Sequence, residues 1–112
     1  MDLSDRKTLV KVLADNGELD QHYNPILSVI GSFFARVVYP SPKDAISTGT
    51  LAVVKYAQIF FLWTDYQRIG ILPKHKLQIG NEIFEINGTP TQIYEKNKLY
   101  LGLNVSKKLE NA

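Results

Sequence analysis

The residues whose types could do acid–base or metal chemistry are few and widely separated. The two histidines, His22 and His75, lie far apart, and neither has a partner at the spacing of a metal site, so each is predicted to be a surface histidine. Glu82 and Glu85 are close in sequence, but strand alternation places them on opposite faces, which disfavours a paired-carboxylate site. These residues therefore predict neither a catalytic site nor a metal site.

The remaining nucleophiles and phosphate-binding patterns lead to the same expectation. The sequence has no cysteine, which excludes a thiolate nucleophile, a Cys-based zinc site and a disulfide framework. Serines and threonines are plentiful, but none lies in a nucleophile motif, and the glycines are scattered at turns without forming a phosphate loop. We therefore predict a protein that is not an enzyme and that uses no cofactor.

One aromatic-rich stretch could instead serve binding. A stacking platform for single-stranded bases, as in OB-fold proteins, would use Phe60, Phe61, Trp63, Tyr66 and Arg68. Period-two alternation places Phe61 and Trp63 in the inward row of a strand, which favours a core role for both. The opposite row is also apolar, and subunit packing explains such a face on a small domain better than bases do. The predicted subunit-packing face consists of Tyr56, Phe60, Leu62 and Tyr66.

Length and composition limit the class of protein. The 112 residues, 45% of them hydrophobic, predict one domain over residues 1–112 with a modest core. A net charge of +2 is weak for a protein that relies on phosphate neutralisation. The first 25 residues carry three basic and five acidic side chains, and the remainder carries ten basic and six acidic. This asymmetry suggests contact between copies or with a basic neighbour.

No stretch of the sequence has the length and apolar character of a membrane span, and no signal-peptide core is present. We therefore expect a soluble protein that acts where it is made and has no membrane partner.

The segment around which the fold is expected to be built is Lys76–Gly88. Apolar and polar residues alternate on both sides of Gly80-Asn81, which predicts a β-hairpin with a two-residue turn. Glycine accepts the positive φ that a type II′ turn needs at its first central position. The segment therefore predicts two paired strands of an antiparallel sheet.

Further strands are expected on both sides of this hairpin. They are Ser32–Tyr39, Leu51–Thr64, and Leu99–Ser106 with Leu99, Leu101, Leu103 and Val105 inside. Thr8–Leu13 is expected to be a short edge strand, with a helical turn as the alternative. Ile26–Ile30 fits either a helical turn or a strand. The expected turns and loops are Asp15–Gly17, Glu18–Pro25, Asp65–Pro73, Gly88–Pro90 and Tyr94–Lys98, with a flexible polar tail at 107–112. The predicted fold class is all-β, a small antiparallel β-barrel or sandwich of about 5–7 strands with a long inserted loop.

The least regular segment of the sequence is Ser41–Thr50. It contains Pro42, Gly49 and several small polar residues, and no periodicity supports a helix or a strand across it. Its only charges, Lys43 and Asp44, cancel. With its flanks the segment is expected to form a loop of about 12–14 residues, and loops of this length in compact domains are often functional or disordered.

The order of these parts resembles the phage head–tail joining family, the small head-completion or stopper proteins of siphophage necks. The resemblance covers residues 6–107. It is carried by Ala35–Ser41 at the end of one strand, by the aromatic segment Tyr56–Arg68, by Lys76–Ile86 with its glycine turn, and by the alternating leucines of Leu99–Lys107.

This resemblance implies a structural role. Proteins of that family assemble as a homo-oligomeric ring, here expected to be a hexamer, beneath the portal and adaptor rings of a DNA-filled capsid. Their loops close the channel and retain the packaged DNA without reading its sequence, and another surface receives the tail proteins. The implied localisation is the head–tail interface of the virion, and the bacterial host cytoplasm during assembly.

Carried onto this sequence, the channel-gating loop is Ser41–Val54, whose near neutrality suits a gate because a strongly basic loop would hold DNA during passage. Two alternatives stay open: a tail-terminator or tail-completion ring protein, and a small OB-like module that binds single-stranded nucleic acid. The gating residues that the resemblance implies are Ser41, Pro42, Lys43, Asp44, Ala45, Ile46, Ser47, Thr48, Gly49, Thr50, Leu51, Ala52, Val53 and Val54.

Overall fold

The computed structural model describes residues 3–40 and 54–108 of the chain. Within these ranges the chain forms six strands and one short helix, so the predicted all-β class is confirmed. The elements are β1 (Thr8–Leu19), β2 (Pro25–Val38), β3 (Val54–Leu62), α2 (Trp63–Ile69), β4 (Lys76–Ile79), β5 (Glu82–Glu95) and β6 (Lys98–Lys108).

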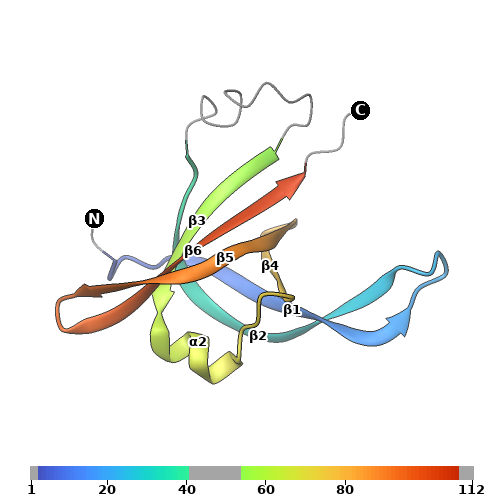
Figure 1. Cartoon of the computed structure of the whole chain (residues 1–112), viewed down its shortest axis with the longest axis horizontal. Helices are drawn as coiled ribbons and strands as arrows, with labels where there is room; N and C mark the ends of the chain where they lie inside the picture. Colours follow the sequence, from blue (N-terminus) through green and yellow to red (C-terminus); the bar gives the residue numbers. More distant parts are fainter. Residues whose placement is uncertain (1–2, 41–53, 109–112) are drawn as a thin grey trace.

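The strands close into a barrel in the order β1-β2-β3-β6-β5-β4, with every neighbouring pair antiparallel (Figure 1). Closure depends on the short pairing of β1 with β4, from Val10–Ile79 to Leu13–Lys76. The expectation that Thr8–Leu13 is an edge strand is therefore wrong, because these residues lie between two neighbours. Within the closed part of the barrel each strand is paired on both sides, which suppresses non-specific strand addition there.

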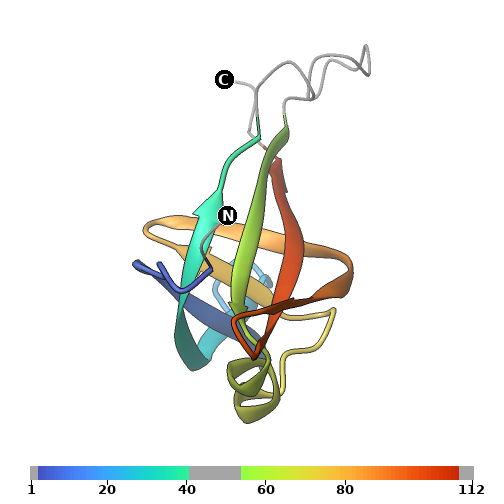
Figure 2. The same cartoon turned by 90° about the vertical axis from the view of Figure 1, so that its left-hand side faces the viewer.

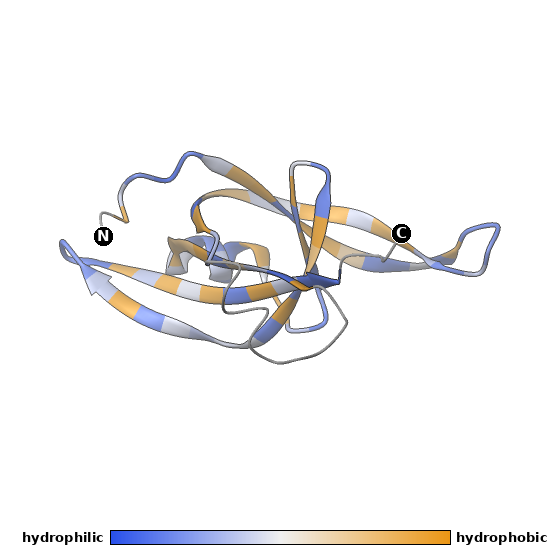
Figure 3. Cartoon of the chain, turned by 90° about the horizontal axis from the view of Figure 1, so that it is seen from above, coloured by the Kyte–Doolittle hydropathy of each residue, from blue (hydrophilic) through white to orange (hydrophobic). Residues whose placement is uncertain are grey.

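The core fills the barrel with one face of each strand. Apolar and polar residues alternate along the strands, as Figure 3 shows from above. Phe33 of β2 and Phe61 of β3 stack at the centre, with 4.3 Å between their ring centroids. Leu101, Leu103 and Val105 of β6 are buried as predicted, whereas Leu99 is only half-buried. The other fully buried barrel residues include Val10, Val12, Ala35, Ile59, Leu77 and Phe84.

The hairpin at Gly80-Asn81 is confirmed. Ile79 pairs with Glu82, which leaves two residues in the turn between β4 and β5. Gly80 has φ of +61° and Asn81 does not have a positive φ, which is the sign pattern of a type II′ turn. This turn type matches the right-handed twist of the strands that it joins, so the local sequence was sufficient to specify it.

The hairpin of β1 and β2 extends well beyond the barrel, and we call residues 14–30 the β1–β2 arm (Figure 1). Asp15–Gly17 does not turn the chain as predicted. It lies within β1 at a register irregularity, where Gly17 adopts φ of +83° and its N–H donates to the Asp15 carboxylate at 2.8 Å. The chain reverses later, at residues 20–24, so the predicted loop Glu18–Pro25 is shorter than expected and Ile26–Ile30 is strand.

The hairpin of β5 and β6 also projects from the barrel, on the opposite side in Figure 1. Gly88–Pro90 does not end β5 as predicted. The pairing with β6 breaks between Asn87 and Thr91 and then resumes to Glu95. Gly88 supplies a positive φ of 72° and Pro90 lies in the unpaired bulge, where its missing N–H costs no ladder hydrogen bond. The predicted turn at Tyr94–Lys98 is confirmed and narrows to Lys96-Asn97, with φ of 51° and 64°.

A helix replaces most of the loop predicted at Asp65–Pro73. Helix α2 covers one end of the barrel, as Figure 2 shows, and Trp63, Tyr66 and Ile69 pack against the core. It ends at Gly70, which adopts a left-handed conformation and donates its N–H to the Tyr66 carbonyl at 3.1 Å. No side chain caps its N-terminus, so the usual sequence signal for a helix start is absent.

The N-terminal segment of the described chain is held against the projecting β5–β6 hairpin. Leu3 is buried and donates its N–H to the Glu95 carboxylate at 3.1 Å. The Arg6 guanidinium lies over the buried Tyr100 ring and also donates to its hydroxyl at 3.3 Å. At the other end, β6 reaches Lys108, so the first two residues of the predicted tail belong to a strand.

Candidate functional site

Residues 41–53 of the predicted gating loop lie outside the described residues, and Val54 is the first residue of β3. What the structure describes is the pair of strand ends that carry this segment. β2 ends at Val38 and β3 begins at Val54, and both lie at the end of the barrel away from α2 (Figure 2). The candidate site is therefore this end of the barrel, which we call the barrel mouth.

The two strand ends at the mouth are joined by a side-chain contact. Lys55, the second residue of β3, places its ammonium 5.0 Å from the ring centroid of Tyr39, which follows β2. A cation over an aromatic face is attracted by the quadrupole of the ring. The contact therefore joins the residue after β2 to the second residue of β3.

A network of three charges lies across the mouth. Lys55 donates to one carboxylate oxygen of Glu82 at 2.7 Å, and Lys107 donates to the other at 3.4 Å. All three belong to the inward rows of their strands. Lys55 lies two positions before the buried Ala57, Glu82 two positions before the buried Phe84, and Lys107 two positions after the buried Val105. We call these three residues the mouth triad. The triad lies at the end of the apolar core, and its charged groups are hydrogen-bonded to one another.

Protonation equilibria follow from this geometry. The hydrogen bond from Lys55, more than any other contact, lowers the pKa of Glu82 below its ordinary value, and Lys107 contributes in the same direction. The hydrogen bond to Glu82 raises the pKa of Lys55. Each side chain of the triad is about one-third exposed, with fractions of 35%, 32% and 30% for Lys55, Glu82 and Lys107. Solvent therefore screens the triad, and its contribution to stability is modest.

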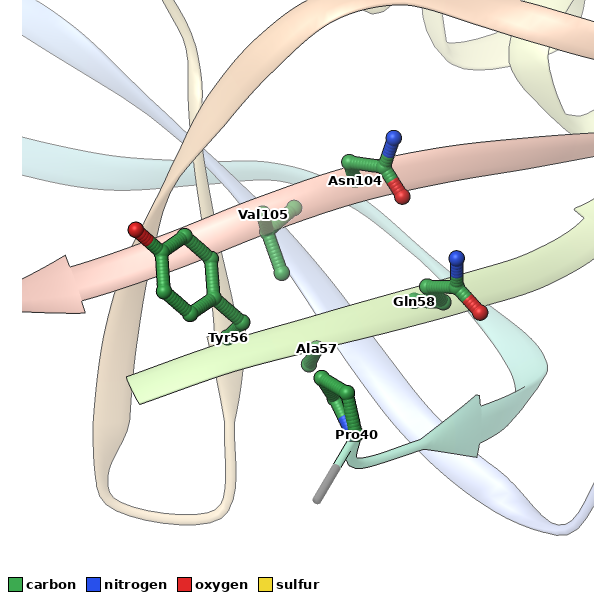
Figure 4. A pocket seen from close by; sticks show the side chains of 6 residues that line it. All are labelled: Pro40, Tyr56, Ala57, Gln58, Asn104 and Val105. Carbon is green, nitrogen blue, oxygen red and sulfur yellow. The ribbon is translucent and has the colours of Figure 1, made fainter. Parts of the chain in front are cut away.

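β2 and β3 separate close to the mouth. They pair only from Arg36–Phe60 to Val38–Gln58, and a shallow pocket of about 250 Å³ lies where they diverge. Figure 4 shows the side chains that line it, with Gln58 and Asn104 projecting side by side from β3 and β6. The described residues that line the pocket are uncharged, so this part of its surface is neutral.

The predicted subunit-packing face is only partly a single surface. Tyr56, Phe60 and Leu62 lie in the outward row of β3 and are half-buried or exposed. Phe60 covers Gly102 of β6, since a Cβ on that glycine would lie 3.1 Å from the Phe60 ring. Tyr66 does not extend this row. It lies on α2 and packs inward, with 6.4 Å between its ring centroid and that of Phe61.

The aromatic platform considered for single-stranded nucleic acid is divided in the same way. Phe61 is fully buried in the core, and Trp63 packs against that core from the first turn of α2. Phe60 lies on the outer surface and Arg68 lies on α2, where it donates to the Ser32 carbonyl at 2.9 Å. The five residues therefore form no common stacking surface.

The two histidines have different environments. His22 is exposed, as predicted, whereas the prediction that His75 is a surface residue is wrong. His75 is 8% exposed, and its Nδ1 accepts a hydrogen bond from the Leu72 N–H at 3.0 Å. Burial, with a smaller effect of Lys74, lowers the pKa of His75, so the neutral imidazole is favoured. Its role is to fix the turn between α2 and β4.

The residues first considered for chemistry do not converge. Glu82 belongs to the mouth triad, whereas Glu85 faces outward and accepts from Lys76 at 3.3 Å. In residues 3–40 and 54–108, no group of three or more His, Asp or Glu side chains could hold a metal ion. In the same ranges, no helix is long and apolar enough to cross a membrane.

Sequence reasoning did not find the mouth triad. The sequence contained a weak sign of it, because Lys55 and Lys107 each stand at the end of an otherwise apolar inward row. A charged residue at such a position needs a partner, but alternation alone cannot say that the partner is Glu82 from a third strand.

Fold and site together define a small closed antiparallel β-barrel with two projecting hairpins, a helix at one end and a charged mouth at the other. A scan against protein-family models finds no match for this chain. A search of the curated proteins finds no match either.

Solved structures do share the fold. A chain from the virion of a native gene transfer agent particle aligns with a TM-score of 0.62 and 15% identity, over 93% of this chain and 96% of that chain. Protein SF1141 from Shigella flexneri 2a aligns with a TM-score of 0.55 and 17% identity, over 94% of this chain and 95% of that one. At these identities the likenesses show a common fold that spans nearly the whole of each chain.

Proposed function

We propose that this chain is a virion structural protein that acts as a head-completion or stopper protein at the neck of a phage-like particle. The observation that carries the proposal is the barrel shared with a virion chain of a gene transfer agent over more than nine-tenths of both chains. The order of sequence segments that resembles the head–tail joining family supports the same role independently. The role is structural and requires no catalytic group.

In this proposal the chain forms a ring beneath the portal and adaptor, and the ring presents a surface for tail attachment. Ser41–Val54 closes the DNA channel and retains the packaged genome. The described surroundings support this role, because Tyr39 and Lys55, which precede and follow this segment in the sequence, are in contact at one end of the barrel. The mouth triad joins β3 and β6 to the start of β5 at this end of the barrel.

The outer row of β3 is proposed to contribute to packing within the neck. Tyr56 and Leu62 flank Phe60 on a strand that the barrel leaves partly exposed, and Gln58 and Asn104 supply neutral hydrogen-bonding groups beside them. An apolar surface with a polar rim is typical of protein–protein contacts.

The proposal is tested by shortening the Ser41–Val54 segment in the particle that encodes the chain. Shortening is expected to leave a folded protein and to yield particles that attach tails poorly or lose their DNA, as measured by packaged DNA per particle after purification. The matched control is Asn97→Gly, in a turn where φ of 64° suits glycine, and it should leave DNA retention unchanged. Particles that keep their DNA and infect normally after shortening would exclude the gating role.

The alternative of a single-stranded nucleic-acid module is tested by equilibrium binding at several salt concentrations. Because Phe61 is in the core and Trp63 packs against it, we expect no tight binding with a steep salt dependence. Tight, salt-sensitive binding that Phe60→Ala abolishes would instead support the nucleic-acid role.

A further inference from the structure

We propose that the β1–β2 arm of one copy of this chain docks in a basic groove of the next copy. The groove lies beside the barrel mouth. This inference rests on the ring of the proposed function and goes beyond it by naming the two surfaces that make the ring contact. Four observations lead to it: the charge of the arm, its exposed apolar residues, its rigidity and the complementary composition of the groove.

The arm is acidic along its whole length. Residues 14–30 contain Asp15, Glu18 and Asp20 and no lysine or arginine. All three carboxylates lie in exposed positions, and Figure 3 shows the tip of the arm as polar. The acidic character noticed in the first 25 residues of the sequence is therefore concentrated on one projecting hairpin.

The arm also exposes apolar side chains that the barrel does not use. Leu19 is 58% exposed and Tyr23, at the tip, is 81% exposed. Val29 and Ile30 are exposed nearer the barrel. Beyond Leu13 the strand β1 has no partner except β2, so nothing in the described chain covers these residues. Apolar groups gathered on a projection are typical of a contact surface.

Local hydrogen bonds hold the arm in one conformation. The Asp20 carboxylate accepts from the N–H groups of His22 and Asn24 at 2.8 and 3.0 Å, and the Asn16 side chain accepts from the Glu18 N–H at 2.8 Å. Tyr23 has a positive φ of 61°, which completes the tight reversal. A rigid projection loses little conformational entropy when it binds.

The groove has the opposite charge. It has a volume of about 480 Å³ and lies beside the ends of β3 and β6 and the β4–β5 hairpin. Among the described residues that line it, Lys76, Lys107 and Lys108 are basic and Glu85 is acidic. Two of these lysines also form ion pairs, Lys76 with Glu85 and Lys107 with Glu82. Val54, Tyr56 and Ile83 supply apolar surface, and Tyr56 and Ile83 are each 41% exposed. An acidic arm with apolar residues fits this combination.

A second copy of this chain is the occupant that the charges favour. Two acidic arms repel each other, so a symmetric arm-to-arm contact is disfavoured. The arm and the groove are different surfaces, so their contact is head-to-tail, and such contacts form rings when the rotation closes. The same contact can form at every subunit of a ring.

Disulfide trapping tests the contact, because the chain has no cysteine of its own. The full-length double variant Gln21→Cys with Ser106→Cys places one thiol on the tip of the arm and one in the groove lining. Under oxidation of the concentrated purified protein we expect a ladder of covalent oligomers on a non-reducing gel. The matched control, Gln21→Cys with Gln92→Cys, moves the second thiol to the exposed face of the other hairpin and should give little product.

Charge reversal separates specific docking from random collision. Glu18 is suited to this because its carboxylate takes no part in the hydrogen bonds that shape the arm, unlike Asp15 and Asp20. In the double-cysteine variant, the further substitution Glu18→Lys should slow formation of the covalent ladder at least about threefold. Adding Lys108→Glu to that variant should restore the original rate. No ladder, a ladder equal to that of the control pair, or a ladder insensitive to both reversals would overturn the inference.

The outcome can be separated from that of the proposed function. A charge-dependent ladder would support the contact between the arm and the groove. If particles also retained DNA after shortening of Ser41–Val54, the gating role of that segment would be excluded. Loss of DNA from those particles without any ladder would support the gate and overturn docking between copies, leaving the arm to a different neck protein.

Discussion

The ammonium nitrogen of Lys55 lies 2.7 Å from a carboxylate oxygen of Glu82, although 27 positions separate the two residues in the sequence. This ion pair connects the strand that leaves the 41–53 segment to the turn of the central hairpin. Lys107 completes the triad from β6, so three strands are tied together at the mouth.

Replacement of Glu82 should reveal a modest, pH-dependent stabilisation. Because the pKa of Glu82 is lowered in the fold, its contribution is present above the ordinary value of 4.5 and is lost as the pH falls through the lowered pKa. Glu82→Gln should therefore reduce the free energy of unfolding at pH 7 by roughly 0.5–1 kcal/mol and by less near pH 3. Urea denaturation at the two pH values measures this.

The control for that measurement is Glu85→Gln, whose side chain is 72% exposed and pairs only with Lys76 among the described ion pairs. It should cost less than Glu82→Gln at pH 7. Equal effects of the two substitutions would show that the mouth triad gives no special stabilisation.

His75 should make the fold sensitive to mild acid. Since burial lowers its pKa from 6.5, the unfolded chain takes up a proton more readily than the folded chain does. The stabilising effect is complete above pH 6.5 and declines as the pH falls from there towards the lowered folded pKa. Thermal melts should show that the Tm decreases between pH 8 and pH 5. His75→Asn should make this decrease smaller, whereas His22→Asn should leave it unchanged. An unchanged slope in His75→Asn would contradict the assignment.

Gly31 should be intolerant of any side chain because α2 packs directly on it. A Cβ at this position would lie 2.9 Å from Cγ1 and from Cγ2 of Ile69. Gly31→Ala is expected to lower the unfolding free energy by about 1–3 kcal/mol, whereas Ser28→Ala on the same strand should have little effect. Chemical denaturation of both variants measures the difference.

The double variant Gly31→Ala with Ile69→Ala identifies the cause of that loss. If the clash is responsible, the double variant should be no less stable than Ile69→Ala alone, because the atoms that the new methyl group meets are gone. Strict additivity of the two losses would point to another cause.

Gly80 should be required for the turn of the central hairpin. Its φ of +61° lies in the left-handed region, where the conformation of a residue with a Cβ is less stable by about 1–2 kcal/mol. Gly80→Ala should therefore lower the denaturation midpoint more than Asn81→Ala does. Comparable midpoints for the two variants would mean that the turn relaxes to a different type.

Several elements were readable from the sequence because their signals are local. The hairpin at Gly80-Asn81 needed only alternation and a glycine at the right place. The inward rows of β3 and β6 followed from the same alternation, since side chains of a strand point to its two faces in turn. These rows, with the absence of long helical periodicity, were enough to predict a small all-β barrel or sandwich.

Other elements depended on contacts that local patterns do not contain. Helix α2 was missed because Trp63–Ile69 has seven residues, no side-chain N-cap and aromatic residues that also suit strands. Strand β5 passes through Gly88–Pro90 because pairing with β6 on both sides outweighs the local turn preference. His75 was predicted to be a surface residue because the residues next to it in the sequence give no sign that the turn after α2 buries it.

The sequence by itself determined the inward rows of β3 and β6, the central hairpin and an acidic first part of the chain, because alternation, turn chemistry and composition are properties of neighbouring residues. Only the tertiary structure decided the closure of the barrel through β1 and β4, the assembly of Lys55, Glu82 and Lys107 at one mouth, and the projection of the acidic residues on a rigid arm. Those features arise from pairing between distant segments, whose register depends on the packing of the whole core.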